Sequence, residues 1–185
     1  MSHASPLPWI LLTLWAVWIY ALQAFFAAAS WSAWVPDVGL VLLLSLAARF
    51  PSADIPLIGL CVGVARASIS VDAAASVLAA SLGAVGMARG VRSVIEIKSP
   101  PVAGLLAFVV ALCVHVWLAW VHEVRIASEL AASAPPRLFG FWSQAWPCAL
   151  STALVAMLFG AALSHLPGLS PLRKRRPWRV GASFP

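Results

Sequence analysis

Residues 101–121 read PVAGLLAFVVALCVHVWLAWV, an uninterrupted run that contains no Asp, Glu, Lys or Arg. A membrane-spanning α-helix needs about 20 consecutive apolar residues, because the hydrocarbon core of a bilayer is about 30 Å thick. Trp117 and Trp120 lie at the far end of the run, and indole rings favour the headgroup region of a bilayer. The run therefore predicts a membrane-spanning helix.

The rest of the chain has the same character, since 62% of its 185 residues are hydrophobic and only 10% are charged. A soluble domain averages about 25% charged residues. The apolar residues fall into six blocks: 8–29, 36–50, 57–71, 73–88, 101–121 and 139–163. Lipid offers no partner to backbone N–H and C=O groups, and the blocks lack the alternation of barrel strands. The sequence thus predicts an all-α integral membrane protein with about six transmembrane helices in one bundle.

Individual blocks carry signals at their ends. Block 8–29 is too long for the core of a signal peptide and no Lys or Arg precedes it, so we expect a first span. Pro36 and Asp37 open the second block, where proline suits a first helical turn and a carboxylate meets the positive end of the helix dipole. Blocks 57–71 and 73–88 are shorter than a full span, so they are either short, packed spans or a re-entrant hairpin. Asp72 between them is the predicted N-cap of the fourth helix.

Charge defines the domains and the topology. Residues 1–165 form one predicted transmembrane domain, and 166–185 form a basic, proline-rich tail. Six spans with a cytoplasmic tail place nine of the 12 Lys and Arg residues on the inside, as the positive-inside rule expects. We therefore expect both termini in the cytoplasm. The net charge of +6 follows this pattern and gives no basic face for nucleic acid, so the lipid bilayer is the expected environment.

Small residues recur at helical spacing in the third and fourth blocks. One row is Gly59, Gly63 and Ala67, and the other is Ser76, Ala80, Ala84 and Ala88. Such rows let two helix backbones approach closely, either inside the bundle or against a partner.

Arg66 lies within an apolar block, where a charge is costly unless it is paired or near the interface. It is expected close to Asp72, either snorkelling to the interface or making a polar contact that docks a subunit or ligand. As a docking charge, its replacement by Leu should leave insertion intact and weaken the partner contact.

Residues with catalytic or metal-binding potential are few. Cys61, Cys113 and Cys148 each lie inside an apolar block and are expected to be small buried hydrophobes. His115 and His122 lie two helical turns apart with Glu123 beside them, which is an incomplete metal set or proton relay. No GxSxG, HExxH or P-loop motif occurs. The sequence therefore predicts no enzyme and no cofactor.

The middle of the chain resembles the bacterial rod shape-determining protein MreD family. The residues that carry the resemblance are WVPDVGLVLLLSLAARF (34–50), PLIGLCVGVARASISVDAAASVLAASLGAVGMARGV (56–91) and IKSPPVAGLLAFVVALCVHVWLAWV (97–121). That family is similarly short, with a Pro-Asp pair at the start of the second helix, here Pro36 and Asp37. A Gly-rich third helix, a short fourth helix, a basic loop and a proline-led fifth helix follow.

The resemblance implies a fold like the six-helix substrate-binding subunits of vitamin uptake systems, without enzymatic activity. It also implies a place in the inner membrane, beside an MreC-like protein and the cell-wall synthases of the elongation complex. Two other classes stay open. One is a small-molecule (vitamin-like) binding subunit of a transporter, with walls made by Trp15, Trp18, Trp117 and Trp120. The other is a membrane enzyme built on Arg66, His115 or Glu123.

Overall fold

Six α-helices and one short 3₁₀ helix make up the described part of the chain, residues 6–28, 32–50, 54–94, 99–129 and 138–169 of a computed structural model. The elements in chain order are α1 (Leu7–Ala28), η1 (Ser32–Trp34), α2 (Val38–Ala47), α3 (Ile55–Ala67), α4 (Ala74–Val94), α5 (Pro100–Glu129) and α6 (Leu138–Leu163). These ranges contain no strand, so the predicted all-α fold is confirmed.

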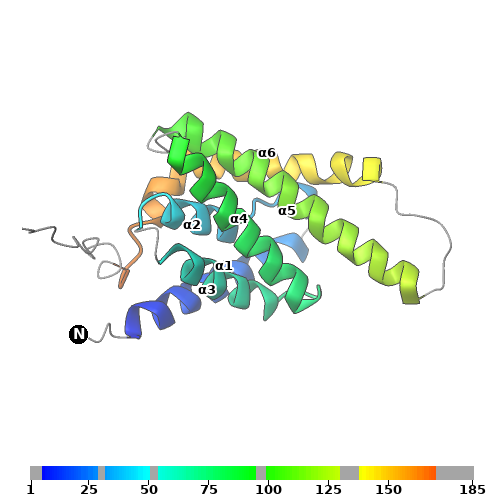
Figure 1. Ribbon diagram of the computed structural model, residues 1–185, viewed down its shortest axis with the longest axis horizontal. Helices are drawn as coiled ribbons and strands as arrows, with labels where there is room; N and C mark the ends of the chain where they lie inside the picture. Colours follow the sequence, from blue (N-terminus) through cyan, green and yellow to red (C-terminus); the bar gives the residue numbers. More distant parts are fainter. Residues whose placement is uncertain (1–5, 29–31, 51–53, 95–98, 130–137, 170–185) are drawn as a thin grey trace, which may run out of the picture.

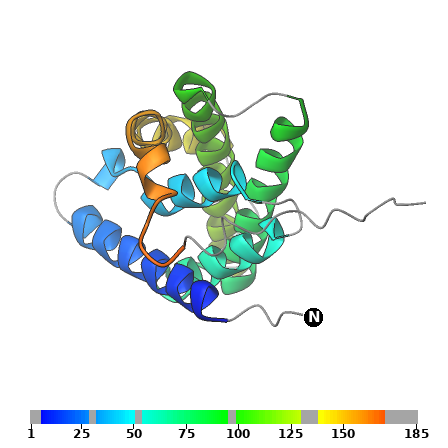
Figure 2. The same ribbon diagram turned by 90° about the vertical axis from the view of Figure 1, so that its left-hand side faces the viewer.

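The centre of the bundle is α2. Figures 1 and 2 show it between the α5 and α6 pair on one side and α1 and α3 on the other, with α4 beside it. It contacts each of these five helices. Its sequence, VGLVLLLSLA, is apolar on all faces, as expected of a helix buried on every side. Eight of its 10 residues are buried.

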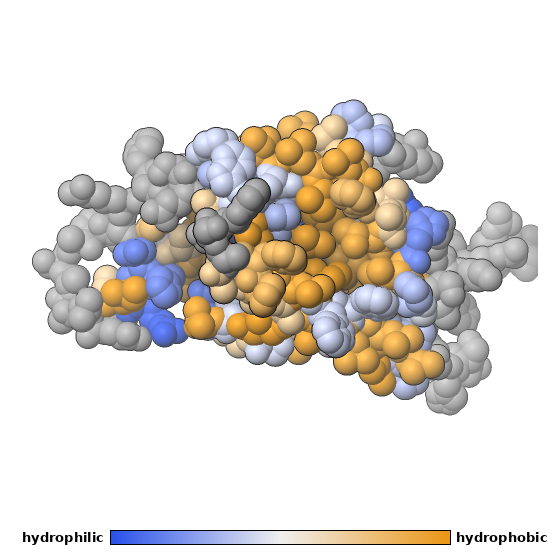
Figure 3. All heavy atoms as spheres, turned by 180° about the vertical axis from the view of Figure 1, so that it is seen from behind, coloured by the Kyte–Doolittle hydropathy of each residue, from blue (hydrophilic) through white to orange (hydrophobic). Residues whose placement is uncertain are grey.

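Four of the described helices are long and apolar enough to cross a membrane: Leu7–Ala28, Ala74–Val94, Pro100–Ser128 and Ala145–Leu163. In Figure 3 apolar residues cover most of the middle of the molecule, and the strongly hydrophilic residues lie toward the two ends of its long axis. The prediction of a membrane protein built as a helical bundle is thereby confirmed. Six complete crossings were predicted, but only four of the described helices are long enough. The other two, α2 and α3, are shorter apolar helices.

The two short helices are α2 and α3, which corrects the expectation that the third and fourth would be short. Helix α2 has 10 residues and α3 has 13, which gives lengths of about 15 and 20 Å at 1.5 Å per residue. Helix α4 has 21 residues because it continues beyond the predicted end at residue 88 to Val94. In this extension Arg92 Nη1 donates to the carbonyls of Ala47 (3.1 Å) at the end of α2 and of Phe50 (2.5 Å) just after it.

The start of α4 also differs from the prediction. The helix begins at Ala74, so Asp72 does not occupy the N-cap position. The Asp72 carboxylate accepts a hydrogen bond from the Ser70 hydroxyl at 2.7 Å, and the Ser70 hydroxyl accepts one from the Asp72 N–H at 3.1 Å. Asp72 therefore stabilises the turn between α3 and α4.

The first residues of the predicted tail pack on the bundle. Trp15 Nε1 of α1 donates to the Pro167 carbonyl at 3.2 Å. Leu169 is buried, and Gly168 adopts a φ of +84°, a left-handed conformation that glycine tolerates. At the same end, Arg49 Nη1 donates to the Ser164 hydroxyl at 2.5 Å. Residues 170–185, which include the predicted basic run, lie outside the described residues.

Candidate functional site

A buried ion pair joins α2 and α3. Nη1 of Arg66 lies 2.7 Å from Oδ2 of Asp37. Asp37 is fully buried, and the Arg66 side chain is 13% exposed. The second carboxylate oxygen of Asp37 accepts from the Leu40 N–H at 2.9 Å, which makes Asp37 the N-cap of α2. The predicted role of Asp37 at the start of the second helix is thus confirmed.

Both charges match the helix dipoles. Asp37 lies at the N-terminus of α2, where the dipole is positive, and Arg66 lies in the last turn of α3, where it is negative. Because α2 and α3 form a helical hairpin, these two ends are its open ends, and the ion pair holds them together. Arg92 stabilises the other end of α2 through the Ala47 and Phe50 carbonyls.

Helix α1 packs over the ion pair through Tyr20. The Arg66 guanidinium lies over the Tyr20 ring, with 5.6 Å between its Cζ and the ring centroid. Such cation–π contacts are strengthened where water is excluded. Gly39 of α2 allows this approach, because a Cβ at that position would collide with the Tyr20 ring.

Helices α5 and α6 reach the same place through Cys148, Thr152 and His115. The Thr152 hydroxyl accepts from the Asp37 N–H at 2.8 Å and donates to the Cys148 carbonyl at 2.6 Å. Cys148 Sγ lies 3.3 Å from His115 Nε2 and 3.1 Å from the Val35 carbonyl. His115 Nδ1 lies 2.8 Å from the Ala111 carbonyl, and a carbonyl only accepts. Nδ1 is therefore the donor in this contact, and the Cys148 thiol donates its single proton to the Val35 carbonyl.

These residues form one polar cluster, which we define as Tyr20, Asp37, Arg66, His115, Cys148 and Thr152. Its members come from α1, the start of α2, α3, α5 and α6. Sequence reasoning singled out Asp37, Arg66 and His115 as polar candidates, expected Cys148 to be a buried hydrophobe, and missed Tyr20 and Thr152. The only local signal for Cys148 and Thr152 was their spacing of four residues on one helix face.

The position of Arg66 corrects the prediction. It was expected beside Asp72, as a snorkelling or docking charge. Asp37 is its partner instead, and Asp72 bonds to Ser70 in the turn between α3 and α4. Of the predicted site residues, the structure therefore brings together Asp37 and Arg66, with Pro36 next to Asp37 in the chain.

Gly59 and Gly63 lie on the face of α3 that packs on α4. A Cβ at Gly59 would lie 2.8 Å from Val85 Cγ2, and one at Gly63 would lie 3.0 Å from Leu78 Cδ2. The row on α3 therefore makes an internal helix contact. In the second predicted row Ser76, Ala80, Ala84 and Ala88 are all buried.

The remaining chemical candidates are dispersed. His122 and Glu123 are exposed and belong to no cluster with His115. Within the described residues no group of three or more His, Cys, Asp or Glu side chains has the arrangement of a metal site. The expectation of three small buried hydrophobes is right for Cys61. It is wrong for Cys113, which is exposed on α5, and for Cys148, which is partly buried and has polar partners.

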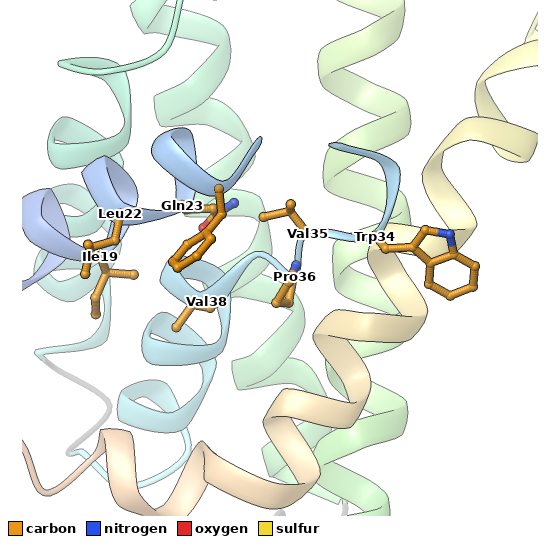
Figure 4. Close-up of a pocket in the computed structure, with 8 residues that line it drawn as sticks. Ile19, Leu22, Gln23, Trp34, Val35, Pro36 and Val38 are labelled. Carbon is orange, nitrogen blue, oxygen red and sulfur yellow. The ribbon is translucent and has the colours of Figure 1, made fainter. Parts of the chain in front are cut away.

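A groove of about 590 Å³ opens beside the polar cluster, between α1 and the segment from η1 to α2. It is lined by Ile19, Leu22, Gln23, Phe26, Trp34, Val35, Pro36 and Val38. Figure 4 shows Ile19 and Leu22 on the α1 side, with Val35, Pro36 and Val38 opposite, and the Trp34 indole directed away from them. That indole packs edge-on against Trp146 of α6, with 5.5 Å between the ring centroids.

The polar cluster is suited to holding helices together. Its two full charges neutralise each other, and its hydroxyl, thiol and imidazole groups bond to one another or to backbone carbonyls. A buried polar network of this kind specifies one arrangement of the helices that supply it. No known protein family, no curated protein and no solved structure matches this chain.

Proposed function

We propose that this protein is a non-enzymatic, multi-pass subunit of a membrane complex, of the kind that the resemblance to MreD implies. It would act in the bacterial inner membrane as part of the cell-elongation (rod shape) complex, with an MreC-like protein and cell-wall synthases as partners. The observation that carries this proposal is the closed ion pair between Asp37 and Arg66. Charges that neutralise each other hold a scaffold in shape and leave little free charge for substrate.

The residues that carry the resemblance to MreD support the proposal, because they start a helix or allow two helices to pack closely. Pro36 and Asp37 start the central helix α2, and Gly59 and Gly63 let α3 pack closely on α4. The surface of α1 supports it as well. Only 17% of an 18-residue apolar stretch of α1 is buried in the bundle. Trp18 and Phe25 are 65% and 73% exposed. A helix with so little internal packing presents most of its surface to lipid or to another membrane protein.

Cytoplasmic termini belong to the same proposal. Arg49 and Arg92 both lie at the C-terminal end of α2, and Arg49 donates to Ser164, next to the end of α6. Basic residues gathered at the end of the bundle from which the tail leaves favour that end as the cytoplasmic one.

The test is co-purification from detergent-solubilised membranes together with deletion of the gene. We expect recovery of an MreC-like protein or a cell-wall synthase, and loss of rod shape on deletion. Recovery of neither partner, combined with normal rods after deletion, would refute the proposal. Complementation of the deletion strain by the Gly86→Leu variant is a suitable control, because a side chain at this α4 position meets open space within the protein.

A second candidate function is a small-molecule binding subunit, and the 590 Å³ groove is the observation that favours it. Ligand pockets have volumes of about 300–1,000 Å³. Of the aromatic walls predicted from the sequence, however, none of Trp15, Trp18, Trp117 and Trp120 lines this groove. A vitamin-like compound retained by the purified protein and identified by mass spectrometry would favour this second function.

A further inference from the structure

The contact between Cys148 and His115 has one proton too few for its acceptors. The Cys148 thiol has a single proton, and two acceptors lie near its Sγ: the Val35 carbonyl at 3.1 Å and Nε2 of His115 at 3.3 Å. In a neutral ring Nε2 is an acceptor, because Nδ1 donates to the Ala111 carbonyl. With the thiol proton on the Val35 carbonyl, Sγ and Nε2 face each other without a proton between them. An acceptor left without a donor costs free energy in a partly buried contact.

A metal cation would satisfy both facing atoms at once. Thiolate sulfur and imidazole nitrogen bind Zn²⁺ at about 2.3 Å and about 2.0–2.1 Å respectively. The two atoms are 3.3 Å apart, so an ion at these bond lengths would have an S–Zn–N angle of about 100°. The tetrahedral angle that Zn²⁺ prefers is about 109°. Sγ and Nε2 therefore already have nearly the separation of two zinc ligands.

Two oxygen atoms also lie near Sγ, the Val35 carbonyl at 3.1 Å and the Thr152 hydroxyl at 4.0 Å. The Thr152 hydroxyl is engaged, because it accepts from the Asp37 N–H and donates to the Cys148 carbonyl. The Val35 oxygen loses its donor when an ion replaces the thiol proton, so it is the available third ligand. Two side-chain ligands are fewer than in a closed structural zinc site, which leaves a coordination position for water.

The pair lies close to one surface of the membrane. Trp117 follows His115 by two residues on α5, and Trp146 precedes Cys148 by two residues on α6, which is about 3 Å along each helix axis. These two indoles are 40% and 46% exposed, and exposed indoles on spanning helices gather at the headgroup level. Cys148 and His115 are themselves only partly buried. An ion from the aqueous phase therefore has a short path to Sγ and Nε2.

We propose that Sγ of Cys148 and Nε2 of His115 together bind one Zn²⁺ ion or a similar thiophilic divalent cation. On binding, the S–H bond breaks, the S–Zn bond forms and the proton leaves to water, so no oxidant or reductant is required. The ion would link α5 and α6, and through the Val35 carbonyl the segment that leads into α2. This proposal goes beyond the proposed function and does not depend on it, because co-purification tests protein partners and not ions.

Titration of the whole, reduced protein with Cd²⁺ in a mild detergent tests the proposal, because a Cd²⁺–thiolate bond absorbs ultraviolet light. We expect one Cd²⁺ per chain, release of one proton per ion and displacement by Zn²⁺. Cys148→Ser should abolish the thiolate absorption, and His115→Gln should weaken binding by about tenfold or more. Cys113→Ser is the matched control, because this exposed cysteine lies on α5 two residues before His115. It should bind Cd²⁺ as the wild type does.

Three results would overturn the proposal. The first is a wild-type protein that binds no Cd²⁺, which would mean that a proton on Nε2 is enough to fill the contact. The second is equal loss of absorption in Cys113→Ser and Cys148→Ser, which would show only general binding to thiols. The third is unchanged affinity in His115→Gln, which would show that the cysteine binds without the histidine. If Cys148→Ser does not fold, the comparison of His115→Gln with Cys113→Ser decides.

Discussion

Replacing Arg66 by Leu should strongly destabilise this protein. From the sequence alone the opposite would be expected, because a charge within an apolar block is costly to insert into a membrane. Asp37 is 0% exposed and bonds to Arg66 at 2.7 Å, so the substitution leaves a fully buried carboxylate without its counter-charge. Breaking a buried pair in this way costs about 3–5 kcal/mol. A single domain is stable by only about 5–15 kcal/mol, so the loss is a large share of the total.

The companion variants separate the charge pair from the helix cap. Asp37→Asn removes the charge and keeps an oxygen that can accept from the Leu40 N–H, so the cap survives. In the double variant Arg66→Leu with Asp37→Asn, neither charge is left unpaired. We therefore expect its loss to be smaller than the sum of the two single losses by about 2 kcal/mol, within the usual range for residues in contact. Arg66→Lys should fall between wild type and Arg66→Leu, because a lysine keeps the charge and loses the planar guanidinium.

The assay is reversible unfolding of the purified protein in mixed micelles, followed by tryptophan fluorescence, for the four variants and the wild type. An Arg66→Leu protein as stable as the wild type would refute the reasoning. So would single losses that simply add in the double variant, because additivity means that the two side chains do not interact.

Two further predictions follow from the packing and one from the proposed topology. Gly63→Leu should destabilise the α3–α4 contact by about 1–3 kcal/mol, since a Cβ at this position would lie 3.0 Å from Leu78 Cδ2. Unfolding in micelles beside the Gly86→Leu control measures this, and equal stability of the two variants would contradict it. Arg92→Ala should cost about 1.5–3 kcal/mol because it removes both bonds to the end of α2, whereas the exposed Arg89 replaced by Ala should cost little in the same assay. Reporter fusions that are active only in the periplasm should be silent after residue 98 and at the C-terminus, and activity at either place would contradict the proposed topology.

The membrane character of the chain was predictable because hydropathy is a local property. Each block of apolar residues predicts a helix on its own, and the described helices lie close to the six predicted blocks. The N-cap at Asp37 was equally local, since a carboxylate at a helix start needs only the N–H of Leu40 three residues later. These predictions required no knowledge of which helices are neighbours.

Predictions about the partners of polar side chains were wrong or missing where those partners are distant in the sequence. Arg66 is six residues from Asp72 and 29 residues from Asp37, and only the α2–α3 hairpin brings the distant carboxylate closer. Arg92, in the part of α4 beyond the predicted end, likewise bonds to the Ala47 carbonyl 45 residues away. Cys148 and His115 lie on different helices 33 residues apart, so no spacing rule within one helix could pair them.

The short central helix gives these polar contacts a common cause. A helix of 10 residues leaves four N–H and four C=O groups without intrahelical partners, and α2 is buried on nearly all sides. In a low-dielectric interior such groups are costly unless charged or polar partners meet them. The Asp37 carboxylate accepts from the Leu40 N–H at one end and Arg92 donates to the Ala47 carbonyl at the other, while Arg66 neutralises the charge that Asp37 introduces. The arginine in the apolar third block is therefore explained by the burial of α2. A variant that disrupts the ion pair should therefore displace α2 more than any other helix.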